Sequence, residues 1–167
     1  ALPKDIQWHM IGHLQRNKVK YMAHFVDLIH GVDTLKTLKE INKQAKNNNR
    51  TIKCLLQVKI AKEETKFGFN FNEIEGLLST VEFAELKNIL IVGFMGMASF
   101  TDDQNQLKDE FSSLNTFFQN QKEKILSENC QLETLSMGMS GDYSLAISNG
   151  STMIRVGSAI FGNRNYN

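Results

Sequence analysis

Short apolar runs alternate with amphipathic stretches along the 167-residue chain. The apolar runs predict six β-strands, at residues 6–11, 28–32, 51–60, 88–95, 131–137 and 152–156. Between them, apolar residues recur every three or four positions and predict helices at residues 17–26, 35–46, 72–81, 103–127 and 142–149. No hairpin signal separates the strands. This strict alternation predicts a parallel α/β sheet in one domain that covers residues 1–167.

Two architectures have this alternation of strands and helices. An open, doubly wound sheet of six strands fits the length of the chain, whereas a complete eight-unit barrel typically needs about 250 residues. The pattern alone slightly favours the open sheet and leaves the barrel as the alternative.

Composition excludes several classes of protein. A formal net charge of +1 lacks the basic excess of a nucleic-acid-binding surface, and no apolar run approaches the length of a membrane span, about 20 residues. The first residues, ALPKDIQW, do not have the layout of a secretory signal. Cys54 and Cys130 lie in apolar surroundings without a neighbouring ligand residue, so we expect buried, reduced thiols in a cytoplasmic protein and no metal site.

Small residues follow the last two predicted strands, in the turns Gly138–Gly141 and Gly157–Ala159. Such turns bring backbone N–H groups close to an anion, and each turn is also predicted to open a helix. In barrels of alternating strands and helices, a phosphate site commonly follows the last two strands. The turns therefore predict a phosphate site, with two ordinary tight turns as the alternative. Neither turn matches a P-loop or a dinucleotide-binding fingerprint.

Other polar residues have two interpretations each. Arg155, inside the last strand, either pairs within the fold or contacts a ligand at the strand end. His9 and His13 lie near the end of the first strand, where they are candidates to line a site but do not define a metal centre. Lys59 is either an inward-pointing lysine able to form a Schiff base or a lysine that reaches solvent.

Four segments together resemble the pyridoxal phosphate homeostasis protein family: WHMIGHLQRNKVK, LLQVKIAKEETKFGF, GFMGMAS and LSMGMSGDYSLAISNGSTMIRVGSAIFGNRNY. The resemblance implies a (β/α)₈ barrel of the TIM type, similar to the N-terminal domain of alanine racemase. It also implies a cytoplasmic, non-catalytic protein that carries or buffers pyridoxal 5′-phosphate (PLP), with PLP-dependent apo-enzymes as recipients. The cofactor-binding residues that it implies are Ser136, Met137, Gly138, Met139, Ser140, Arg155, Gly157 and Ser158.

The chain departs from the family pattern at its beginning. The family's Schiff-base lysine lies in a segment like AVSKTKP, the next strand carries one like FGENYVQE, and neither segment occurs here. We therefore expect strands three to eight of the barrel, with the first two β/α units and the lysine absent, and no catalytic residue. Lys59 is not at the lysine's position. The open edges of such a fragment would favour self-association.

Two other functions remain open from the sequence. One is a PLP-dependent enzyme that resembles an amino-acid racemase, and the other is a phosphate-binding α/β domain unrelated to PLP.

Overall fold

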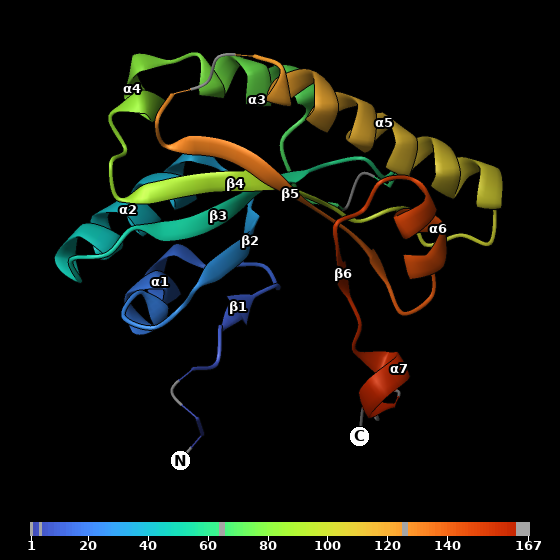
Figure 1. Ribbon diagram of the computed structural model, residues 1–167, viewed down its shortest axis with the longest axis horizontal. Helices are drawn as coiled ribbons and strands as arrows, with labels where there is room; N and C mark the ends of the chain where they lie inside the picture. The colour runs from blue at the N-terminus through green and yellow to red at the C-terminus, as the bar shows by residue number, and fades with distance from the viewer. Residues whose placement is uncertain (1, 4, 64–65, 125–126, 163–167) are drawn as a thin grey trace.

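The fold is one parallel sheet of six strands, seen in a computed structural model that describes residues 2–3, 5–63, 66–124 and 127–162 (Figure 1). Each strand pairs in parallel with the next strand in the chain, so the spatial order is the sequence order. The strands are β1 (His9–Met10), β2 (Leu28–Val32), β3 (Ile52–Val58), β4 (Ile89–Gly96), β5 (Cys130–Met139) and β6 (Met153–Arg155).

This strand order decides between the two predicted architectures. A doubly wound sheet reverses its strand order at a switch point, whereas a barrel adds each strand on the same side of the previous one. The observed order does not reverse, so the slight preference of the hydrophobic pattern for an open doubly wound sheet is wrong. The sheet is a half-barrel of six strands, with β1 and β6 as its edge strands.

The helices predicted at residues 35–46 and 142–149 agree with the structure to within one residue at each end, and the other predicted helices differ more. Residues 17–26 form a short 3₁₀ turn and a single helical turn instead of one helix. The helix predicted at 72–81 is two helices, and the long helix predicted at 103–127 ends earlier, with residues 125–126 outside the described part. The helical elements are η1 (Arg16–Lys18), α1 (Val19–Met22), α2 (Leu35–Asn47), α3 (Phe71–Leu78), α4 (Val81–Ala84), α5 (Gln104–Lys122), α6 (Tyr143–Ser148) and α7 (Ser158–Phe161).

Local hydrogen bonds explain where the longer helices begin. The Thr34 hydroxyl accepts from the backbone N–H of Thr37 at the start of α2. Asn70 and Glu73 form a reciprocal capping box at the start of α3. Each cap satisfies a backbone donor that has no partner inside the helix, which typically stabilises the helix by about 1 kcal/mol.

Two apolar clusters pack on the two faces of the sheet. The larger one joins the outer face of the strands to the helices, and the buried side chains Leu38, Ile74 and Phe111 are the helices' contribution to it. The smaller cluster, on the inner face, consists of four buried strand residues: Leu28, Leu55, Val92 and Met95. The inner cluster therefore stays within the strands, and polar side chains occupy the inner face nearer the strand ends.

Gly93 allows β4 and β5 to approach closely. A Cβ atom on Gly93 would lie 1.7 Å from the carbonyl oxygen of Thr134, so no other residue fits without moving β5. The register between the two strands shifts beside this glycine. Shifts of this kind bend strands, and they occur between every neighbouring pair from β2 to β6.

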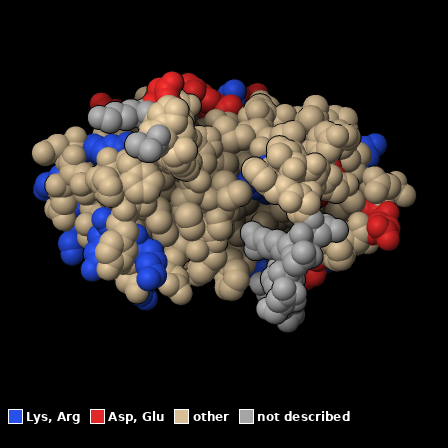
Figure 2. Space-filling model, turned by 90° about the horizontal axis from the view of Figure 1, so that it is seen from below, with Lys and Arg blue, Asp and Glu red and all other residues tan. Residues whose placement is uncertain are grey.

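The predicted strand at residues 6–11 is reduced to the two residues of β1. Side chains along this edge are unusually exposed for their type, among them Ile6, Trp8, Ile11 and Phe25. A groove of about 510 Å³ lies beside them and is lined in part by Ile6, Trp8 and Phe25. Figure 2, which views this side of the molecule, shows Lys and Arg gathered at its left end and few charged side chains across its centre. Within the described residues, no helix has the length and apolar character needed to cross a bilayer.

Candidate functional site

The two small-residue turns meet at the hydroxyl of Ser140. The backbone N–H groups of Gly157 and Ala159 donate to Ser140 Oγ over 3.3 and 3.2 Å. Two donors from the second turn therefore converge on one oxygen atom that belongs to the first. We call these two turns, residues 138–141 and 157–159, the turn pair. An oxygen atom of a phosphate group would be held by the same two donors.

The turn pair owes its shape to a glycine and an aspartate. Gly138 has φ +96°, and a Cβ atom there would lie 2.7 Å from the Cβ of Ala146. The Asp142 carboxylate accepts from the backbone N–H of Met139 over 2.5 Å, while the Asp142 N–H donates to the Met139 carbonyl. These contacts close the first turn and aim Ser140 at the second. The second turn has open space around Gly157, where an added Cβ would meet nothing within 4 Å.

The helices after the turns are shorter than the sequence pattern suggested. Helix α6 has six residues and α7 has four, so the aligned peptide dipoles at each N-terminus are few. The electrostatic attraction of the turn pair for an anion must therefore come from individual N–H groups and from a nearby positive side chain.

Arg155 provides that positive charge. Its guanidinium donates to Ser136 Oγ over 2.8 Å and to the carbonyl oxygen of Gly96 over 2.9 Å. Burial lowers the pKa of Arg155 to about 10, and the nearby charge of Asp142 opposes that shift, so the guanidinium stays positive at neutral pH. Within the described part of the chain, no carboxylate lies within ion-pairing distance of it. A half-buried positive charge whose hydrogen bonds go only to neutral acceptors favours an anionic ligand.

A histidine pair continues this hydrogen-bonded chain toward β1. His30 is 1% exposed, and its Nδ1 lies 3.2 Å from Ser136 Oγ. Its Nε2 lies 3.2 Å from Nδ1 of His9. Burial, followed by the charges of His9 and Arg155, lowers the pKa of His30 to about 4, so this imidazole is neutral at pH 7. The half-barrel thus has a polar row, His9–His30–Ser136–Arg155, at the inner face of β1, β2, β5 and β6.

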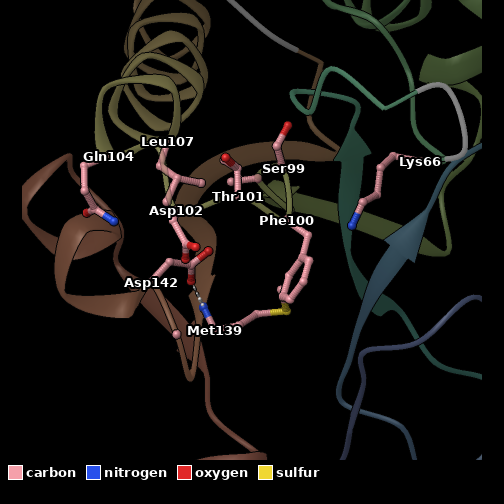
Figure 3. A pocket seen from close by; sticks show the side chains of 11 residues that line it. Lys66, Ser99, Phe100, Thr101, Asp102, Gln104, Leu107, Met139 and Asp142 are labelled. Carbon is pink, nitrogen blue, oxygen red and sulfur yellow. Dashed lines mark hydrogen bonds between the residues drawn. The ribbon is translucent and has the colours of Figure 1, made fainter.

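A cavity of about 230 Å³ opens beside the first turn, between the segment after β4 and the start of α6 (Figure 3). Asp102 and Asp142 both point into the same part of it, while Lys66 points in from the other side. Met139 and Phe100 supply apolar surface. The two carboxylates, Asp102 and Asp142, make this part of the cavity unfavourable for an anion.

The structure brings together most of the residues that the sequence indicated. Ser140, Gly157, Gly138, Met139 and Arg155 lie at the turn pair or directly below it, with backbone or side-chain contacts given above. Ser158 begins α7 and is exposed at the same turn. Ser136 lies inside β5, fully buried, and reaches the site only through Arg155 and His30.

Two residues, Met137 and His13, are placed differently. The side chain of Met137 is fully buried in the cluster between sheet and helices, so it does not face the turn pair. His13 is directed to Asp33, 3.3 Å away, and stacks on Phe67. Lys59 is exposed, as the solvent-reaching interpretation expected. Lys53, in β3, is also exposed, and its Nζ lies 3.8 Å from the Asp27 carboxylate.

His30 and the turn-closing role of Asp142 were missed in the sequence. His30 lies in the apolar run LIHGV at the same parity as Leu28, and this single polar residue in a buried strand was the available signal.

Both cysteines are buried, and burial raises the pKa of the Cys130 thiol to about 12 and that of Cys54 higher. Among the residues that the structure describes, no three His, Cys, Asp or Glu side chains gather to hold a metal ion.

A family model described as the N-terminal domain of alanine racemase matches residues 3–165. The chain belongs to this family. Among curated family members, the pyridoxal phosphate homeostasis protein of Aquifex aeolicus is 37% identical over 164 residues, which are 97% of this chain and 69% of that protein. The protein of the same name from Escherichia coli is 32% identical over 168 residues, or 96% of this chain and 66% of that protein. The chain thus spans about two thirds of the length of these relatives.

Several solved structures are similar to the half-barrel. PipY of Synechococcus elongatus, solved with PLP bound, superposes with a TM-score of 0.83 at 31% identity, over 96% of this chain and 72% of PipY. The same protein without PLP gives a TM-score of 0.86 at 32% identity, over 96% and 73%. An alanine racemase of Clostridium difficile gives 0.68 at 14% identity, over 97% and 41%, and shares the fold alone.

Proposed function

We propose that this chain binds pyridoxal 5′-phosphate through its phosphate group and takes part in PLP homeostasis. The observation that carries the proposal is the turn pair, in which Gly157 and Ala159 donate to a single oxygen atom, Ser140 Oγ. Arg155 adds a half-buried positive charge that has only neutral hydrogen-bond acceptors among the described residues. This combination suits a phosphate ester better than a neutral ligand.

In the proposed site, Ser140, Gly157 and Ser158 surround the phosphate with hydroxyl and backbone N–H groups. Gly138 and Met139 shape the first turn, while Met137 contributes only through its backbone. Arg155 lies under the turn pair and faces the ring or the phosphate of the ligand. His9 lines the inner face farther from the turn pair, and His13 belongs to the rim.

The relatives support PLP as the ligand, because the curated members are named for PLP homeostasis and PipY was solved with PLP bound. PLP supplies a reactive aldehyde and an electron-withdrawing ring. Lys53 and Lys59, the lysines of β3 and its end, are both exposed. The binding that we propose for this chain is reversible and depends on contacts with the phosphate group.

We further propose that this role is non-enzymatic and intracellular, with PLP-dependent apo-enzymes as recipients. A carrier needs a site that holds the cofactor and releases it again, and the turn pair provides contacts of that kind. Reversible retention matches the donors present, which are backbone N–H groups, hydroxyls and one guanidinium. A racemase-like activity would instead produce turnover of an amino acid in the presence of PLP.

We also propose that the domain of residues 1–167 is part of an eight-stranded barrel, in which two further β/α units lie between the edges β6 and β1. The exposed apolar side chains at the β1 edge, including Ile6, Trp8 and Phe25, are the surface that such units would cover. Without them, the same surface favours self-association. Sedimentation velocity over a range of concentrations tests this, and a monomer at every concentration would contradict self-association.

The functional proposal is tested by calorimetric titration of the chain with PLP, pyridoxal and inorganic phosphate. We expect PLP to bind, phosphate to compete, and pyridoxal, which lacks the phosphate group, to bind far more weakly. Arg155→Gln should weaken PLP binding roughly 10- to 100-fold, because it removes a charge-assisted contact. Arg16→Gln is the matched control, since Arg16 is exposed on η1.

Equal affinity for PLP and pyridoxal would refute the phosphate site. Competition by phosphate without any preference for PLP would instead indicate a general phosphate-binding domain. Racemisation of an amino acid by the PLP-loaded chain would contradict the non-enzymatic role. Borohydride treatment followed by intact-mass measurement should leave the mass of the chain unchanged, and a covalent adduct would contradict reversible binding.

A further inference from the structure

The row His9–His30–Ser136–Arg155 joins four strands through three consecutive hydrogen bonds. We propose that His30, supported by His9, is a positioning residue that fixes the Arg155 guanidinium through Ser136. This inference rests on the proposed function to the extent that Arg155 contacts the phosphorylated ligand. It goes further by assigning ligand retention to a histidine pair that does not itself touch the turn pair.

The donor and acceptor roles along the row follow from arginine chemistry. A guanidinium can only donate, so Ser136 Oγ accepts from Arg155. Ser136 is fully buried, and its hydroxyl hydrogen needs an acceptor. Among the described residues, Nδ1 of His30 is the acceptor within reach, at 3.2 Å. Ser136 therefore donates to His30 while it accepts from Arg155.

These donor and acceptor roles also determine the tautomer of His30. If Nδ1 accepts, the proton of the neutral imidazole is on Nε2, which then donates to Nδ1 of His9 at 3.2 Å. The alternative tautomer would place a donor on Nδ1 and leave the buried Ser136 hydrogen without a partner. One arrangement therefore gives each of the three hydrogen bonds of the row a donor and an acceptor, and the donors run in a single direction, from Arg155 to His9.

The charges that face His30 agree with a neutral imidazole. His9 approaches from β1 and Arg155 from β6, and both lower the pKa of His30, in addition to the larger effect of its burial. Asp142, at the first turn, acts on Arg155 from the other side. A neutral His30 lets Ser136 keep its free lone pair toward Arg155, so the guanidinium is held at Ser136 and at the Gly96 carbonyl below the turn pair.

The test compares two substitutions of His30. His30→Asn can place an amide oxygen near the position of Nδ1 and preserve the acceptor for Ser136. His30→Leu fills similar volume without an acceptor. His24→Leu is the control, because His24 is exposed and packs on Phe25 away from the row. Far-UV circular dichroism and thermal melting establish that each variant is folded before binding is measured.

Calorimetric titration with PLP gives the first readout. We expect His30→Leu to weaken PLP binding about tenfold, and His30→Asn and His24→Leu to bind within about threefold of the unsubstituted chain. In the double variant His30→Leu/Arg155→Gln, binding should equal that of Arg155→Gln alone, because the two residues act as one unit. Additive losses, or a His30→Asn variant as weak as His30→Leu, would overturn the inference.

A second readout needs no ligand and separates the two proposals. The Nη–H resonances of the Arg155 guanidinium, identified by their loss in Arg155→Gln, report whether the guanidinium is held, because Nη1 and Nη2 make its contacts. We expect faster exchange of these protons with water in His30→Leu and protection close to the unsubstituted level in His30→Asn. Unchanged Arg155 resonances in His30→Leu would overturn the positioning role. If the chain retains neither PLP nor phosphate, the proposed function fails, while these resonances still decide the role of His30.

Discussion

Acid pH should destabilise the fold through His30. Burial, together with His9 and Arg155, lowers the pKa of this histidine from 6.5 to about 4. In the unfolded chain the imidazole regains its ordinary pKa, so the unfolded state takes up a proton first as the pH falls. The contribution of neutral His30 to stability is therefore complete above the unfolded pKa and is lost as the pH falls from 6.5 toward 4.

The size of this loss follows from the two pKa values. Proton linkage gives a loss from His30 of about 2 kcal/mol between pH 7 and pH 5, and about 3 kcal/mol between pH 7 and pH 4. A small domain has a total stability of only about 5–15 kcal/mol, so a loss of this size is readily measured. Burial of the imidazole is the main cause; in addition, a protonated His30 places a second positive charge beside Arg155 and turns its Nδ1 from an acceptor into a donor.

Urea unfolding at pH 7 and at pH 5 measures the effect, with His30→Asn as the comparison. Other histidines and carboxylates titrate in both proteins, so the difference between the two pH dependences isolates His30. We expect the free energy of unfolding of the unsubstituted chain to fall by about 2 kcal/mol more than that of His30→Asn. Parallel pH dependences for the two proteins would refute the buried, neutral state of His30.

Three further predictions concern stability. Gly93→Ala should destabilise the fold by about 3 kcal/mol or more, or prevent folding, because its Cβ would overlap the Thr134 carbonyl. Thermal melting measures this loss, and Gly76→Ala is the control because Gly76 on α3 has open space around it. Glu110→Ala should lower the free energy of unfolding, measured in urea, by about 3 kcal/mol, because the buried Glu110 carboxylate accepts from the N–H and the hydroxyl of Ser99 over 2.7 Å each. Asp109 lies on the exposed side of α5, and a loss no larger than that of Asp109→Ala would contradict this prediction. Asn70→Ala should cost about 1 kcal/mol through loss of the capping box, whereas Asn72→Ala, in the exposed first turn of α3, should cost less.

The hydrophobic pattern was a good guide to elements whose burial repeats along the chain. The predicted strand at residues 28–32 has the bounds of β2, and His30 is its single polar residue. Helix α2 has a regular apolar face with Leu38, Ile41 and Ala45 buried, and it begins at Leu35, as the pattern predicted. These are local signals, and no long-range contact is needed to read them.

The pattern failed where pairing between distant segments decides the structure. Residues 6–11 are apolar enough for a long strand, but β1 pairs with β2 at only two positions, so most of the run lies outside the sheet. The barrel-like strand order was also not readable from periodicity, because parallel strands of open sheets and of barrels have the same burial pattern. The resemblance to a known family supplied that information.

Prediction of the site divides in the same way. The glycines and serines of the turn pair are contiguous in sequence, so Gly138, Ser140 and Gly157 could be named in advance. His30 lies 106 positions from Ser136, and only the folded sheet brings the two together. The opposite orientation of Met137 follows from strand alternation, because its neighbour Ser136 faces inward while Met137 packs against the helices.

Binding of the PLP phosphate group at the turn pair can be observed by two-dimensional amide NMR of the chain, titrated separately with PLP, pyridoxal and inorganic phosphate. We expect PLP to shift the backbone amide resonances of Ser140, Gly157 and Ala159 in a saturable way. Phosphate should shift the same resonances, and pyridoxal should leave them unchanged. Saturable PLP shifts confined to the Asp102 cavity or to the β1 edge, with the turn-pair amides unmoved, would contradict this expectation.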